Sequence, residues 1–282
     1  MSTLREKRKK ERRALRRRKP ADWTVVLILC AIAVCCGGYL IYHHWSVKQR
    51  ELEYERLRQE ETLSAATETV IAEPETEENT EETVIYCDPV YDFGQLHEQN
   101  EDIYAWIVVP GTQVDYPLLQ SGTDNYYLDY NLDHSKGYPG CIYTNQCNRK
   151  DFSDYNTVLY GHNMKNGSMF GSIHSFEDET FFDEHPYIYV YTENERLTYE
   201  IYEAAKFTDV YIPSEYVISS KDDRDQFLAD VREKVSDNKL HVREDMEIGE
   251  EDRLITLSTC VSGERNHRYL VIGVLVETAL YR

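Results

Sequence analysis

The chain has 282 residues, enough for one substantial folded domain with appendages but short for two full ones. Its formal charge of −20 is unevenly distributed, because residues 1–22 hold eleven Lys/Arg against three acidic residues and carry +8. After residue 45 only Cys87, Cys141, Cys147 and Cys260 remain, too few for a disulfide scaffold and without zinc-ligand spacing, so we expect no metal site.

The first predicted element is an uncharged run at residues 24–42, flanked by Trp23 and Trp45. A helix of this length crosses a hydrocarbon core of about 30 Å, and aromatic rings favour its interfaces. A cleaved signal peptide is the alternative, but the run is long for one and no A-x-A site follows it. We therefore expect a single transmembrane helix at 23–45. The basic tail 1–22 then acts as a topology signal that stays in the cytoplasm, and nucleic-acid binding loses its support.

Two segments of different composition follow this helix. Residues 46–62 are rich in helix formers and can continue the membrane helix outward. Residues 63–85 are rich in Glu and Thr and have little to bury. We expect 46–85 to be an acidic extracellular stalk that carries a folded domain at 86–282.

The folded domain begins with a short amphipathic helix at 90–100, which leads into a strand that ends at Pro110. Short runs rich in Tyr and β-branched residues then predict a β-barrel or sandwich. These runs lie at 115–120, 140–145, 156–162, 187–192, 197–207, 254–260 and 269–278. One helix interrupts them at 221–236, with acidic residues at its start and one apolar stripe.

The most informative cysteine is Cys260, which ends the strand at 254–259. A thiol at a strand end faces a cleft while the strand fixes its position, although a free Cys is more often a buried apolar side chain. The stretch also resembles the anion-binding loop of Cys-dependent phosphatases, which has five residues between Cys and Arg. Here Arg265 follows after four and Asn266 stands next, so the phosphatase interpretation fails on spacing.

A candidate base ends another strand, where residues 158–160 lead into Gly161 and His162. A thiol with a pKa of about 8.5 is only slightly ionised at pH 7, so a nucleophilic Cys needs such a base. The domain has further His residues, which we expect mostly at the surface or in turns. These are at positions 97, 134, 174, 185, 241 and 267.

Three motifs in this order resemble the sortase family of cysteine transpeptidases. TLSTC at 256–260 is similar to the family's nucleophile strand, YGH at 160–162 to its histidine segment, and HRYLVIGVLVE at 267–277 to its final strand. The likeness extends over 86–282. The helical segments at 90–100 and 221–236 and the short Cys–Arg spacing resemble class B sortases.

The resemblance implies a mainly β fold. It is an eight-stranded sortase-type β-barrel with an N-terminal helical segment and a helix between strands 6 and 7. It implies Cys260 as nucleophile, His162 as acid/base and Arg268 as oxyanion partner, with the mid-loop Arg265 as competitor. It also implies a substrate groove, and neither a cofactor nor a metal. The residues expected to line the groove are Ser258, Tyr160, Asn125 and Leu128.

The implied function is that of a membrane-anchored transpeptidase. It cleaves the C-terminal sorting signal of secreted proteins through a Cys thioester and transfers the acyl group to an amine of a peptidoglycan cross-bridge or lipid II. A pilin-polymerising sortase is one alternative, and a non-catalytic surface module on a stalk is another. A papain-like protease fits poorly, because its Cys comes before its His, whereas His162 precedes Cys260 by 98 positions.

Overall fold

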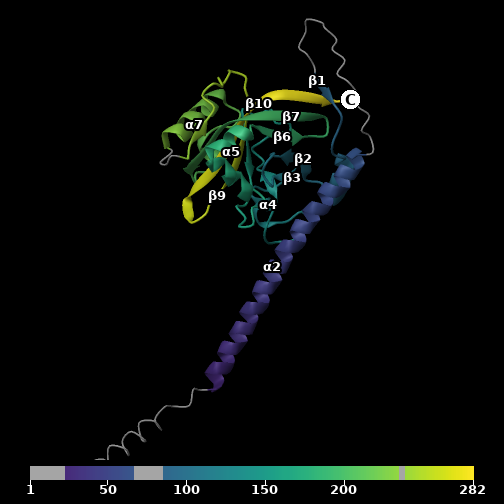
Figure 1. The fold of residues 1–282 in the computed structure, drawn as a ribbon, viewed down its shortest axis with the longest axis vertical. Coiled ribbons are helices and arrows are strands. Elements are labelled where there is room, and N and C mark those ends of the chain that lie inside the picture. The colour runs from purple at the N-terminus through teal and green to yellow at the C-terminus, as the bar shows by residue number, and fades with distance from the viewer. Residues whose placement is uncertain (1–22, 67–84, 235–238) are drawn as a thin grey trace, which may run out of the picture. The chain divides into compact units, whose positions relative to one another are not determined.

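The computed structural model describes residues 23–66, 85–234 and 239–282 (Figure 1). The predicted tail 1–22 and most of the Glu/Thr-rich segment lie outside the described residues. The chain divides into two compact units between Glu51 and Leu52, and each is described by itself.

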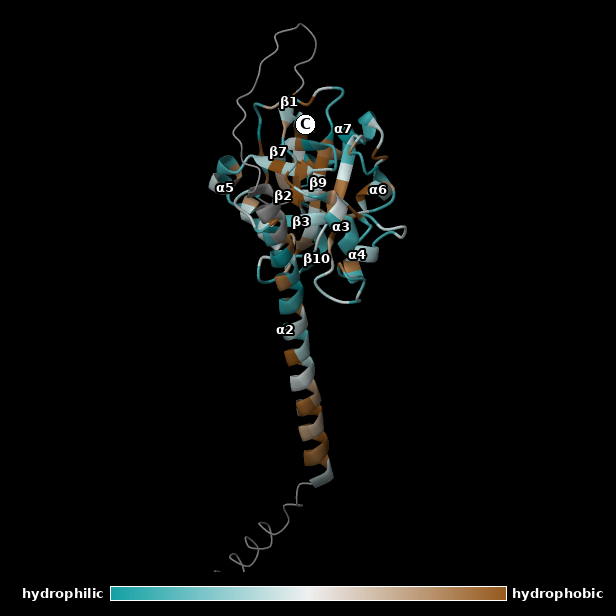
Figure 2. Cartoon of the chain, turned by 90° about the vertical axis from the view of Figure 1, so that its right-hand side faces the viewer, coloured by the Kyte–Doolittle hydropathy of each residue, from teal (hydrophilic) through white to brown (hydrophobic). Residues whose placement is uncertain are grey.

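A single helix, α2 (Trp23–Ala66), contains the predicted membrane span. Its portion Trp23–Gln59 is the one helix in the described ranges that is long and apolar enough to cross a membrane. Figure 2 shows the apolar residues gathered in the amino-terminal part of α2 and hydrophilic residues further along. The expected apolar helix at 23–45 is therefore confirmed in length and composition, and its orientation stays a prediction.

The described residues of the unit 52–282 form ten strands. These are β1 (Ile85–Cys87), β2 (Ile103–Val108), β3 (Asp115–Leu119), β4 (Ile142–Thr144), β5 (Asn156–Tyr160), β6 (Tyr187–Tyr191), β7 (Glu195–Thr208), β8 (His241–Val242), β9 (Leu254–Val261) and β10 (Glu264–Tyr281). They form one sheet in the order β1-β10-β9-β5-β4-β3-β2-β6-β7-β8, and β10 also pairs with β7. That extra pairing closes eight of the strands, β2 to β7 with β9 and β10, into a barrel. The predicted eight-stranded barrel is confirmed, and β1 and β8 extend it at the edges.

Short helices connect the strands. They are α3 (Phe93–Gln99), α4 (Tyr126–Asp129), the 3-10 helix η1 (Gly171–Glu177), α5 (Glu179–Glu184), α6 (Ile212–Glu215) and α7 (Lys221–Lys234). The helix α3 begins at its cap Asp92, whose side chain accepts the Gln95 amide, and it matches the helix expected at 90–100. The helix α7 lies between the sixth and seventh barrel strands, as expected, and carries two Asp in its first turn.

The sheet separates two apolar clusters. Ile255 and Leu257 of β9 belong to the barrel interior, whereas Leu254 belongs to a second cluster that includes Phe227 of α7. Successive side chains of a strand point to opposite faces. Ser258 and Cys260 therefore share the face of Leu254, outside the barrel.

The folded unit begins earlier than the sequence predicts. Tyr54 and Leu57, in the expected stalk, are only 4% and 3% exposed. The Tyr54 hydroxyl donates to the Gly140 carbonyl at 3.1 Å, and Arg58 Nε donates to the Asp115 carbonyl at 2.8 Å. Leu57 and Arg58 follow Tyr54 by three and four residues, so both lie beside it on one face of the helix. The stretch 52–59 is thus a packed part of the folded unit, although the sequence predicts a stalk at 46–85 and a folded domain only from residue 86.

Candidate active site

The strands β5 and β9 run parallel and place His162 and Cys260 at the same end of the sheet. Tyr160 pairs with Ser258, and the Thr259 hydroxyl donates to the Gly161 carbonyl at 2.8 Å. His162 and Cys260 each follow this pair by two residues. By the same alternation that orients Ser258, both side chains start from one face of the sheet.

Arg268 lies directly opposite Cys260. The two are Cα partners in the antiparallel pair of β9 and β10, a position where side chains share a face and Cβ atoms are about 5 Å apart. The Cys260 thiol is free and its residue is exposed. Arg268 Nη1 donates to the carbonyl oxygens of His267 at 3.0 Å and Arg265 at 3.4 Å. Arg265 itself is exposed in the hairpin, so the strand register favours Arg268 as the partner of the thiol.

The His162 ring is oriented by a backbone carbonyl. Its Nε2 lies 2.7 Å from the Leu128 carbonyl oxygen, which can only accept a hydrogen bond, so Nε2 carries a proton. Nδ1 is then the nitrogen that can take a proton from a thiol. The Tyr138 ring packs against the imidazole with its centroid 4.9 Å away. Leu128, expected in the groove wall, therefore also holds the candidate base through its main chain.

The other expected groove residues differ in exposure. Ser258 is buried, and Tyr160 is half-buried with a hydroxyl that has no hydrogen-bond partner among the described residues. Asn125 is exposed, in a left-handed conformation, and its Oδ1 accepts the Tyr143 hydroxyl at 3.1 Å. Their roles toward a substrate stay predictions.

Two further tyrosines extend this wall, and no sequence pattern distinguishes them from the other tyrosines. The Tyr160 ring stacks between Tyr143 at 5.5 Å and Tyr211 at 6.2 Å. Burial raises the pKa of Tyr211 to about 12, and it raises the pKa of the other two tyrosines further. All three phenols are therefore neutral at physiological pH. Tyr143 is buried, whereas Tyr160 and Tyr211 are partly exposed and leave aromatic surface beside the strand that carries Cys260.

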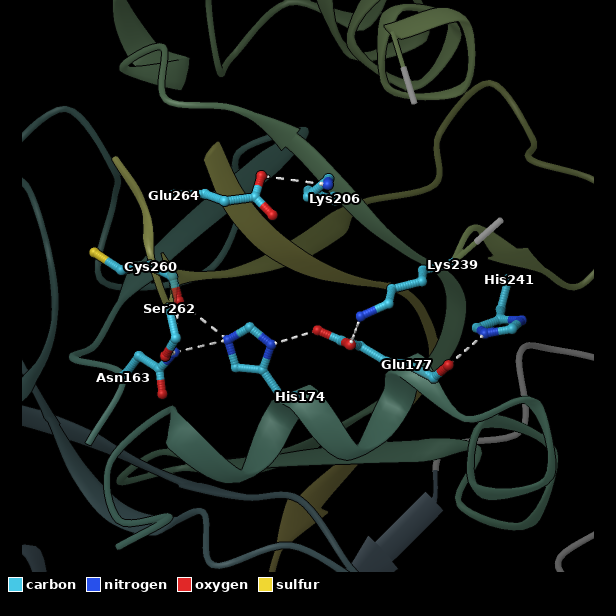
Figure 3. A network of polar contacts seen from close by, with 9 residues as sticks. All are labelled: Asn163, His174, Glu177, Lys206, Lys239, His241, Cys260, Ser262 and Glu264. Atoms are coloured by element: carbon cyan, nitrogen blue, oxygen red, sulfur yellow. Dashed lines mark hydrogen bonds and ion pairs between the residues drawn. The ribbon is translucent and has the colours of Figure 1, made fainter. Parts of the chain in front are cut away.

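A second histidine, His174, contacts the main-chain carbonyl of Cys260. His174 Nε2 lies 3.0 Å and Asn163 Nδ2 lies 2.8 Å from the Cys260 carbonyl oxygen (Figure 3). From the sequence, His174 is one of several histidines expected mostly at the surface or in turns. Its link to Cys260 spans 86 residues of the sequence, so no local pattern pointed to it.

Known proteins that resemble this chain belong to the family that this geometry indicates. The family model of the Sortase domain matches residues 107–276, well over half of the chain. The chain therefore belongs to the sortase family, whose members are cysteine transpeptidases.

The relatives define the subclass. Sortase B of Listeria monocytogenes is 34% identical over 168 residues, which are 58% of this chain and 65% of that protein, just under two thirds. Sortase B of Staphylococcus aureus is 26% identical over 261 residues, 91% and 97% of the two chains. The chain is thus a class B sortase.

Solved structures agree with this assignment. A Staphylococcus aureus sortase B–substrate complex superposes with a TM-score of 0.63 at 25% identity, covering 82% of this chain and 97% of that one. Clostridium perfringens sortase B superposes with a TM-score of 0.59 at 30% identity, covering 66% and 100%.

Proposed function

We propose that Cys260, His162 and Arg268 form the transpeptidase centre of this class B sortase. The single observation that supports this most strongly is the strand register. It sets Arg268 opposite Cys260 and brings His162 to the same end and face of the sheet.

The chemistry follows from these three groups. His162 Nδ1 takes the thiol proton, and the Cys260 thiolate attacks the carbonyl carbon of the scissile peptide. The oxyanion that forms is stabilised by the Arg268 guanidinium, a contact typically worth about 3 kcal/mol of barrier. The leaving amine takes the proton from His162 and a thioester remains. An acceptor amine then attacks the thioester, gives its proton to His162, and displaces the Cys260 thiolate, which takes that proton back from His162 to restore the thiol.

The proposed substrate is the C-terminal sorting signal of a secreted protein, and the proposed acceptor is an amine of a peptidoglycan cross-bridge or lipid II. Ser258, Tyr160, Asn125 and Leu128 would line the substrate groove. The lysine of a pilin is the alternative acceptor. A non-catalytic surface module is disfavoured, because such a module needs no exposed thiol opposite an arginine.

We also propose the placement that the sequence predicts. Residues 1–22 would lie in the cytoplasm, 23–45 would span the cell membrane, and the catalytic domain at 86–282 would lie outside on the segment 46–85, of which residues 52–59 pack against the domain. The apolar amino-terminal part of α2 and the basic tail before it support this orientation.

The test uses the full chain in detergent, a panel of sorting-signal peptides and an amine acceptor, with products identified by mass spectrometry. Cleavage and amine transfer should both vanish in Cys260→Ala, because no thioester can form. Cys87→Ala is the matched control and should stay active, because Cys87 lies on the edge strand β1. Activity in Cys260→Ala would refute the proposed centre.

A further inference from the structure

Two side chains from outside its own strand pair reach the carbonyl oxygen of Cys260. Asn163 Nδ2 reaches it at 2.8 Å and His174 Nε2 at 3.0 Å, and Asn163 Nδ2 also lies 3.2 Å from Ser262 Oγ. Figure 3 shows both side chains converging on this carbonyl. Because the Cys260 side chain is exposed, its position depends largely on the peptide that bears it.

His174 is itself held on two sides. Its Nδ1 lies 2.7 Å from Glu177 Oε1, and its ring stacks on Tyr269 with centroids 4.9 Å apart. Tyr269 directly follows Arg268 on β10. The imidazole therefore links η1 to both strands that carry the candidate centre.

Glu177 fixes the protonation of His174 at Nδ1. Burial raises the pKa of Glu177, but hydrogen bonds and charge from Lys239 and His174 outweigh burial and hold the pKa below its usual value. Glu177 is thus a carboxylate at neutral pH, and a carboxylate can only accept. Lys239 pairs with it, and His241 Nε2 contacts its main-chain carbonyl at 3.1 Å (Figure 3).

Nε2 of His174 lies 3.0 Å from the Cys260 carbonyl oxygen and 3.0 Å from Asn163 Nδ2. The imidazole, the amide and the carbonyl therefore form one network around the peptide of Cys260.

We propose that His174, held by Glu177, is a positioning residue for the nucleophile. Together with Asn163 it fixes the peptide of Cys260, and through it the direction from which the thiolate attacks. The proposal rests on the proposed function, because it requires Cys260 to be the nucleophile. A misplaced reacting atom reduces the rate of the chemical step more than it reduces substrate binding.

The experiment measures kcat and KM for a sorting-signal peptide with the full chain in detergent. His174→Phe keeps an aromatic ring to stack on Tyr269 and removes both nitrogens. We expect kcat to fall about tenfold and KM to change less than about twofold, since a shift of about 1 Å can cost ~100-fold and Asn163 remains as a donor. His174→Gln, whose amide can donate in place of Nε2, should recover most of kcat.

His241→Phe is the matched control, because it removes a histidine from the same network without touching the Cys260 carbonyl. It should leave kcat near the value of the unaltered chain. Unchanged kcat in His174→Phe, or an equal fall in His241→Phe, would overturn the proposal. If His174→Phe does not fold, Asn163→Ala tests the same carbonyl, and unchanged kcat there would overturn it too.

Cys260→Ala separates the two proposals. Its inactivity together with a normal His174→Phe would remove only the positioning role. Activity in Cys260→Ala would remove the proposed centre and the positioning role with it.

Discussion

Leu57→Ala tests whether the helical stretch 52–59 is part of the catalytic fold or only a tether. Leu57 is 3% exposed, and Tyr54, one helical turn earlier, is 4% exposed. Buried Leu→Ala substitutions cost about 2–5 kcal/mol of unfolding free energy. Because the helix lies at the edge of the unit, where neighbours can relax, we expect the lower part of that range, about 2–3 kcal/mol.

Leu52→Ala provides a matched control on the same helix. The chemical change is identical, but Leu52 is 46% exposed. Its cost should stay within about 0.5 kcal/mol, as for most surface substitutions. Both variants are measured by urea unfolding of the full chain in detergent, followed by near-UV circular dichroism. Equal unfolding free energies for the two variants would refute the packing of this helix onto the domain.

A series of contacts connects this helix to the candidate base, His162. Tyr54 donates to the carbonyl of Gly140, and the next residue, Cys141, donates its amide to Tyr127 at 3.0 Å. Tyr127 precedes Leu128, whose carbonyl holds His162. A chain that starts at residue 86 would lose the first contact of this series. It should therefore be less stable than a chain that starts at residue 52.

Two further predictions concern charged residues. Arg268→Lys should lower kcat by about 100-fold or more with little change in KM, because it loses the forked donors opposite the nucleophile. Arg265→Lys should lower kcat only mildly. The opposite order, measured with one peptide and one amine, would show that Arg265 is the oxyanion partner. Glu203 is fully buried, with Arg232 Nε 3.6 Å from its Oε2, and burial raises its pKa to about 7 despite that cation. Since the native state keeps this proton above the ordinary carboxyl pKa, the unfolding free energy should fall as pH rises from about 4.5 to 7, by at most about 3 kcal/mol. Glu203→Gln should flatten that slope in urea titrations, and an unchanged slope would mean that another group titrates there.

The elements that carry the candidate centre could be predicted because each is specified by a local sequence pattern. Short runs rich in Tyr and β-branched residues identified β9 and β10, and the apolar stripe with Asp at its start identified α7. The order of the three motifs then gave the family. Each of these elements and each single motif lies within fewer than about 20 residues, and no distant contact is needed to interpret it.

The features that could not be predicted from the sequence depend on contacts between distant segments. Tyr54 and Leu57 lie among Glu and Arg residues, so their small apolar face was lost in a charged helix. His174 sits on a 3-10 helix, and nothing in its neighbours distinguishes it from the other histidines. Tyr211 joins the aromatic wall only because the segment after β7 returns to β5. Burial and pairing of this kind are set by the tertiary fold.

The candidate centre depends on one non-local register more than on any single motif. In the parallel pair of β5 and β9, a shift by one residue would turn His162 to the face opposite Cys260. Buried contacts oppose such a shift, since Thr256 Oγ1 donates to Asn156 Oδ1 at 2.8 Å. Gly161 adds a second constraint, because a Cβ there would lie 2.8 Å from the Phe170 ring and 2.5 Å from Ile142 Cδ1. Glycine before the histidine thus lets the end of β5 lie against Phe170 and against Ile142 of β4, which helps to hold the register that the candidate centre needs.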